Sequence, residues 1–238
     1  MPSNTGDTDT ISDLKNKRSG DDHNPTPSAY AISDKERAII NAAREIFLEN
    51  GFDGASMDTI AITAGVSKRT VYNRFQSKEK LFAATIEETC KRILPVSVDT
   101  LDISEPIEKV VRVLAEKILR GLLQPDVISL RRIATFEAGR KPEVGQSFLE
   151  HGLHFMLNSS ADMLGKVAEA NNLKIDDTYT AVCQLGALLT EPLYSEMLFG
   201  AVPQDLDAAV EKQLAGALKM FWNAYGDGRF GLEPSAFQ

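Results

Sequence analysis

The tetrapeptide Ala-Gly-Val-Ser at 64–67 most constrains the fold, because it lies between two short segments with helical apolar spacing. Gly65 can adopt the positive φ of a tight turn, and Ser67 can cap a helix that follows. Before the turn, Ser56 can cap a helix that gathers apolar residues on one face: Met57, Ile60, Ala61 and Ala64. These signals predict two short helices joined by a sharp turn, which is a helix-turn-helix.

The second of these helices has two unlike faces. Val71 and Phe75 lie on one face and predict contact with a core. The opposite face carries long cations, a phenol and an amide near the start of the helix: Lys68, Arg69, Tyr72 and Asn73. A helix that reads base edges in the major groove presents side chains of these kinds. A solvated helical face is the alternative interpretation.

Positive charge is concentrated around this helix. Residues 65–82 hold five basic residues and one acid, whereas the whole chain holds 26 basic and 34 acidic residues and has a net charge of −8. A local cationic surface on an acidic protein favours contact with a polyanion. Lys78, at the start of the next predicted helix, can meet a phosphate together with free backbone N–H groups.

The remainder of the sequence also predicts helices, and no segment shows the two-residue alternation of a strand. We therefore predict an all-α fold with an N-terminal three-helix helix-turn-helix domain and a larger helical domain. The expected organisation is a disordered tail, a helix-turn-helix DNA-binding domain and a larger helical domain, at residues 1–33, 34–92 and 93–238. The tail is too polar to offset its ordering entropy by burial.

The stretch "GFDGASMDTIAITAGVSKRTVYNRFQSKEKLF" resembles the N-terminal DNA-binding domain of TetR-type transcriptional regulators. The resemblance spans about residues 34–90, and its spacing holds through three helices. Ser56 stands where the family usually has Thr, and Val71 where it usually has Leu. Arg69 replaces a frequent Gly, which adds a cation to the predicted reading face.

The resemblance implies roles for particular residues. Bases or nearby phosphates would be contacted by Lys68, Arg69, Tyr72 and Asn73, and the DNA backbone by Ser56, Thr70, Arg74 and Lys78. It also implies that the larger domain binds a small-molecule effector and dimerises. The expected function is a repressor, without enzymatic activity and without a cofactor.

Two C-terminal segments, 176–199 and 205–225, carry more apolar residues than one core face needs. Packed against a second copy of the chain, they would complete a four-helix bundle. A two-fold dimer presents two recognition helices, so we expect its operator to be palindromic.

Candidate effector-binding residues are aromatic, sulfur-containing or histidine side chains in the larger domain: Phe136, His151, His154, Phe155, Met163, Tyr179 and Cys183. Such residues at helical spacing more often form an ordinary core. An apolar pocket with few polar groups favours a hydrophobic or aromatic effector.

Two other functions fit parts of the sequence. Glu150, His151 and His154 could belong to a metal-dependent hydrolase, but HxxH lacks the i, i+4 spacing of HExxH zinc sites. A helical adaptor would explain the apolar C-terminal helices and leave the basic face without a role. We expect no metal site. No apolar run is long enough to cross a membrane, and the N-terminal residues lack a signal-peptide core, so we expect a cytoplasmic protein.

Overall fold

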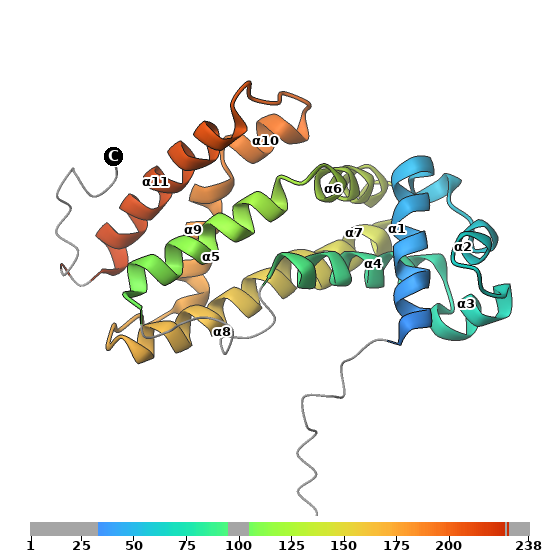
Figure 1. The fold of residues 1–238 in the computed structure, drawn as a ribbon, viewed down its shortest axis with the longest axis horizontal. Helices are drawn as coiled ribbons and strands as arrows, with labels where there is room; N and C mark the ends of the chain where they lie inside the picture. Colours follow the sequence, from blue (N-terminus) through green and yellow to red (C-terminus); the bar gives the residue numbers. More distant parts are fainter. Residues whose placement is uncertain (1–32, 95–104, 227, 229–238) are drawn as a thin grey trace, which may run out of the picture. The chain divides into compact units, whose positions relative to one another are not determined.

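The computed structural model describes residues 33–94, 105–226 and 228, and every regular element in these ranges is a helix (Figure 1). The predicted all-α class is confirmed for the described residues. The predicted tail lies outside these ranges, except for Ser33. The first four helices are α1 (Asp34–Gly54), α2 (Met57–Thr63), α3 (Lys68–Phe75) and α4 (Lys78–Ile93). The later elements are α5 (Ile107–Leu122), α6 (Pro125–Ala138), α7 (Pro142–Phe148), the π-helical η3 (Leu149–His154), α8 (Phe155–Ala170), α9 (Thr178–Thr190), α10 (Leu193–Leu198) and α11 (Leu206–Tyr225).

Three phenylalanine rings form the core beneath the helix-turn-helix. Phe47 and Phe52 stack at a centroid distance of 5.8 Å, and Phe82 packs edge-on against them at 5.1 and 5.5 Å. Val71 and Phe75 of α3 are buried as predicted. Aromatic contacts between α1 and α4 therefore support α3, the predicted recognition helix.

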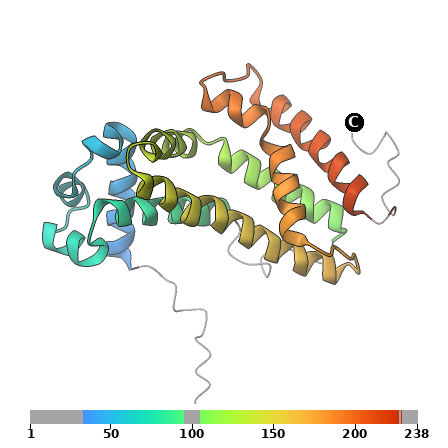
Figure 2. The ribbon, with the colours of Figure 1, turned by 180° about the vertical axis from the view of Figure 1, so that it is seen from behind.

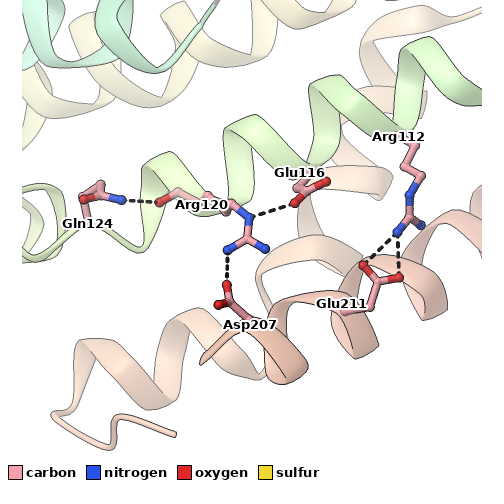
Figure 3. A network of polar contacts seen from close by, with 6 residues as sticks. All are labelled: Arg112, Glu116, Arg120, Gln124, Asp207 and Glu211. Atoms are coloured by element: carbon pink, nitrogen blue, oxygen red, sulfur yellow. Dashed lines mark hydrogen bonds and ion pairs between the residues drawn. The ribbon is translucent and has the colours of Figure 1, made fainter. Parts of the chain in front are cut away.

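Helices α5, α8, α9 and α11 surround the main apolar cluster of the larger region. From behind, α9 and α11 lie side by side (Figure 2). Ion pairs join α5 to α11: Arg120 contacts Asp207 at 2.6 Å, and Arg112 contacts Glu211 at 2.6 Å (Figure 3). Because these pairs are exposed, each contributes at most about 1 kcal/mol, and the apolar cluster dominates stability.

Helix α4 packs on both parts of the chain, since it contacts α1 and also α5, α7 and η3. Two glycines let it approach closely. A Cβ atom at Gly152 would lie 3.1 Å from Cγ2 of Ile86, and one at Gly121 would lie 2.6 Å from Cγ2 of Ile93. The position of α4 is therefore sensitive to small changes in η3 and α5.

A second junction joins the end of α1 to the loop between α6 and α7. Asp53 forms ion pairs with Lys141 and with Arg140, the latter at 3.5 Å. The Lys141 ammonium also lies 5.1 Å from the Phe52 ring centroid and 3.8 Å from the buried carboxylate of Glu137. The described residues from Asp34 onward belong to one compact unit. The predicted boundary at 92/93 falls at the end of α4 and remains a prediction.

Candidate nucleic-acid interface and effector cavity

Each of the helices α2, α3 and α4 begins at a serine whose hydroxyl accepts a backbone hydrogen bond. Ser56 accepts from Thr59 N at 3.0 Å, Ser67 from Thr70 N at 3.1 Å, and Ser77 from Lys80 N at 3.3 Å. Such caps satisfy N–H groups that have no partner inside the helix. Two of these residues are predicted to contact the DNA backbone. Ser56 is the exposed cap of α2, and Thr70, which is half-exposed, contacts the Ser67 cap of α3.

The turn between α2 and α3 has the predicted geometry. Gly65 has a φ of 66°, where a side chain would be strained. Its N–H donates to the Ile62 carbonyl at 3.0 Å, and the Val66 N–H donates to the Ala61 carbonyl at 3.0 Å. These bonds close the end of α2 and turn the chain sharply into α3.

The outer face of α3 is exposed along its length, and it carries the four predicted base-reading residues: Lys68, Arg69, Tyr72 and Asn73. Among the described residues, Arg69 and Asn73 have no side-chain partner, and Tyr72 is 41% exposed. The Lys68 ammonium lies 2.8 Å from the Asp58 carboxylate and 5.7 Å from the Tyr72 ring centroid. The hydrogen bond that the Lys68 ammonium donates to Asp58 raises the pKa of Lys68.

Acidic partners on this surface were missed by the sequence analysis. Asp58 of α2 pairs with Lys68, and Glu36 of α1 pairs with Arg74 at 3.3 Å. A count of charge over a continuous stretch cannot find acids that the fold brings in from other helices. The cationic face is therefore less positive than its sequence indicates. Arg69 and Asn73 have no side-chain partner in the described ranges, so they are the most available for DNA.

Lys78 is placed differently from the expectation. Its ammonium donates to three backbone carbonyls near the end of α1, those of Phe52 at 2.6 Å, Ala55 at 3.0 Å and Asp53 at 3.3 Å. It also lies 4.6 Å from the Phe52 ring centroid. An ammonium has three donors, so all of them are directed at protein carbonyls. Lys78 joins α4 to the end of α1, and its predicted phosphate contact remains untested.

We expect Lys78→Met to lower the free energy of unfolding by about 2 kcal/mol, because it removes charge-assisted hydrogen bonds to partly buried carbonyls. Urea unfolding of the full chain followed by circular dichroism measures this loss. The exposed Lys80→Met is the matched control and should change stability by less than about 0.5 kcal/mol. Equal stability of the two variants would contradict a structural role for Lys78.

A cavity of about 360 Å³ lies between α4, α5, α6, α8, α9 and α10, and α7 and η3 also contribute to its lining through Phe148, Gly152 and Leu153. Helix α4 contributes four lining residues: Ile86, Thr89, Cys90 and Ile93. The lining as a whole is mainly aliphatic, and it includes both cysteines of the chain, Cys90 and Cys183. Burial raises the pKa of Cys90 to about 12, so its thiol stays protonated and unreactive at neutral pH.

The predicted effector-binding residues divide into two groups. Met163 and Cys183 line the cavity. Five do not: Phe136, which is 66% exposed; Tyr179, which is 42% exposed; and His151, His154 and Phe155, which lie in or next to η3.

The π-helical turn explains the histidine and Phe155 positions. A regular α-helix turns by about 100° per residue. Leu149–His154 instead forms the π-helix η3, which changes the direction in which the side chains in and after it point. His151 instead faces α4, with Nδ1 3.4 Å from the Glu87 carboxylate. Burial favours a higher pKa for Glu87, but the hydrogen bond and charge of Lys91, helped by His151, hold that pKa below its ordinary value.

Within the described ranges, no three His, Cys, Asp or Glu side chains gather as a set of metal ligands. The same ranges contain no helix with the length and apolar character that a membrane span requires.

A capped helix-turn-helix with an exposed polar recognition face defines the class of helix-turn-helix DNA-binding proteins. Two family models match the chain: "Bacterial regulatory proteins, tetR family" over residues 39–85, and "AefR-like transcriptional repressor, C-terminal domain" over residues 109–227. The second match covers half of the chain. This chain belongs to the TetR family of DNA-binding transcriptional regulators, which are not enzymes.

Individual relatives agree with this assignment. A TetR-family regulator from Mesorhizobium loti is 33% identical, with a TM-score of 0.67, over 80% of this chain and 96% of that one. The flavonoid-responsive regulator FrrA is 32% identical, with a TM-score of 0.61, over the same shares. The regulator UidR of Escherichia coli K12 is 50% identical over 56 residues, which span 24% of this chain and 29% of UidR.

Proposed function

We propose that this chain is a cytoplasmic, homodimeric repressor that binds a palindromic operator and is released from it by a small hydrophobic or aromatic effector. The observation that carries the proposal is the double role of α4. Its first turns place Leu81 and Phe82 in the core beneath the recognition helix, and its later turns line the cavity. An effector in the cavity therefore touches the helix that supports α3.

The close contacts of α4 explain how occupancy would be transmitted. Gly152 and Gly121 leave little free space beside Ile86 and Ile93. An effector that fits better when α4 is displaced would favour a different separation of the two recognition helices. A coupling of 1–3 kcal/mol between the two sites would change operator affinity by about 5–150-fold.

The outward faces of α9 and α11 support dimerisation. Small side chains are exposed on α11, including Ala208, Gly216 and Ala224, together with Met220, which is 58% exposed. On α9, Ala187 is exposed and also lines the cavity. Small residues allow helices of two copies to approach closely. FrrA is flavonoid-responsive, which supports release of this chain from DNA by a small organic molecule as well.

The test is a pull-down of fragmented DNA from the source genome, with sequencing of the retained fragments. We expect the wild-type chain to enrich a short palindrome, less strongly at higher salt because releasing condensed counterions into a more concentrated salt solution is less favourable. Arg69→Ala/Tyr72→Ala should lose this enrichment, since each base contact is worth about 1–3 kcal/mol. Lys117→Ala, which removes an exposed cation from α5, is the control and should behave as wild type.

Equal enrichment by the Arg69→Ala/Tyr72→Ala variant would overturn the assignment of the reading face and favour the helical-adaptor alternative. With the palindrome in hand, a reporter gene placed behind it should be expressed weakly in the presence of the protein. Stronger expression with the protein than without it would contradict repression.

A further inference from the structure

Arg131 is the one charged residue among the described residues that line the cavity. It lies on α6, half-buried, with its guanidinium carbon 4.9 Å from the ring centroid of the buried Tyr194. The described chain offers it no carboxylate within ion-pair distance. Its neighbour Arg132 is different, because that side chain donates to the carbonyls of Leu198 at 2.7 Å and Met197 at 2.9 Å.

The surroundings of Arg131 cannot neutralise its charge. A guanidinium remains ionised and presents five N–H donors in one plane. The Arg131 guanidinium lies over the Tyr194 ring and also donates a hydrogen bond to the Tyr194 hydroxyl, which leaves most of its five donors free. The other polar lining groups are neutral, and two of their hydroxyls are already bonded to helix carbonyls: Thr89 donates to Thr85 O at 2.8 Å and Thr190 to Gly186 O at 2.9 Å.

The cavity is long, and Arg131 lies toward one end. Lining residues on α5 run from Val111 to Leu122, which corresponds to about 16 Å along the helix. Tyr194, the partner of Arg131, packs in the apolar cluster at the C-terminal end of α5 with Leu119 and Leu123. Val111 belongs to the separate cluster toward the other end.

We infer that the effector is an elongated amphipathic anion, with an apolar chain lying along α5 and α8 and a carboxylate bound by Arg131. The planar guanidinium matches a carboxylate through two parallel hydrogen bonds, which a neutral or cationic head group cannot form. The aliphatic lining provides the complementary environment for the chain. This inference rests on the proposed function, because it specifies the ligand of the cavity beside α4.

The first test compares three probes that differ only in the head group: dodecanoate, dodecan-1-ol and dodecylamine. Calorimetry on the full-length wild-type protein should show that dodecanoate binds at least about tenfold more tightly than the other two, as a charge-assisted pair predicts. Cys183 reports the location. It lines the cavity and is less buried than Cys90, so dodecanoate should slow its labelling by a maleimide.

Variants then assign the preference to Arg131. In Arg131→Gln, the three probes should bind within about twofold of one another. Arg131→Lys keeps the charge without the planar fork and should keep part of the preference. Arg132→Gln removes the same charge one residue along the helix and should keep the full preference. Thermal melting of every variant checks that the fold is retained.

Two outcomes would overturn the inference alone: equal binding of dodecanoate and dodecan-1-ol by wild type, or an unchanged carboxylate preference in Arg131→Gln. The proposed function fails differently. If none of the three probes binds or protects Cys183 while the palindrome is still bound, the inference and the assigned effector site both fall and DNA binding stands. If the protein binds no DNA but still prefers dodecanoate, the inference about the effector stands and the proposed function as a repressor is wrong.

Discussion

Gly216→Arg is expected to convert the protein from a dimer to a folded monomer and to weaken operator binding by about 100-fold or more. Gly216 is exposed on α11, and a Cβ atom there would meet nothing within 4 Å, so the monomer accommodates a side chain. Replacing a helical glycine should even stabilise the helix by up to about 1 kcal/mol. In the proposed dimer, however, an arginine would hold the two α11 helices apart.

The loss of affinity follows from the loss of the second half-site. Two linked recognition helices bind with an effective concentration that can raise affinity by about 10²–10⁴-fold over one helix. Light scattering after size exclusion measures the mass, and fluorescence anisotropy with the enriched palindrome measures affinity. Val113→Arg, at a position of α5 that is 52% exposed, is the matched control and should remain dimeric. A dimeric Gly216→Arg variant would contradict the proposed interface.

Phe82→Ala is expected to lower the free energy of unfolding by about 3–5 kcal/mol, the largest stability change that we predict. Phe82 is fully buried and packs edge-on against both Phe47 and Phe52, so its removal leaves a cavity between α1 and α4. Urea unfolding monitored by circular dichroism gives the magnitude. Operator binding should fall with stability, unlike in Arg69→Ala/Tyr72→Ala, which should lose binding while remaining folded.

The control for this core substitution is Ile62→Ala. Ile62 lies on α2 and is 80% exposed, so its replacement should cost less than about 0.5 kcal/mol. A loss below about 1 kcal/mol in Phe82→Ala would show that α1 and α4 can close around the missing ring, and that the aromatic cluster does not fix the position of α3.

The helix-turn-helix could be predicted from sequence because its determinants are local. Gly65, Ser67 and the alternation of Val71 and Phe75 with polar residues act within one or two helical turns, and the structure confirms the turn, the cap and the buried face. Their spacing also carries the resemblance to the TetR family, so the fold and the general function could be predicted together.

The cavity could be predicted only in part, because its lining depends on how distant helices pack. Residues at helical spacing indicate which side chains share a face, but not which neighbour that face meets. Met163 and Cys183 line the cavity, whereas the π-helical turn shifts His151 toward α4. Arg131 had no local signal in the sequence, since its distinguishing feature is the lack of an acidic neighbour around it in the described structure.

The Asp53 junction has a consequence for regulators assembled from parts of different proteins. The bonds from Lys78 to the end of α1 lie wholly within α1–α4 and would travel with a transplanted DNA-binding segment. The pairs from Asp53 to Arg140 and Lys141 would not, because one partner comes from each side of the graft. A chimera that places a foreign segment on the rest of this chain therefore needs an acid at the position of Asp53. Without one, Arg140 loses this ion pair and Lys141 keeps only the buried Glu137 carboxylate, 3.8 Å away.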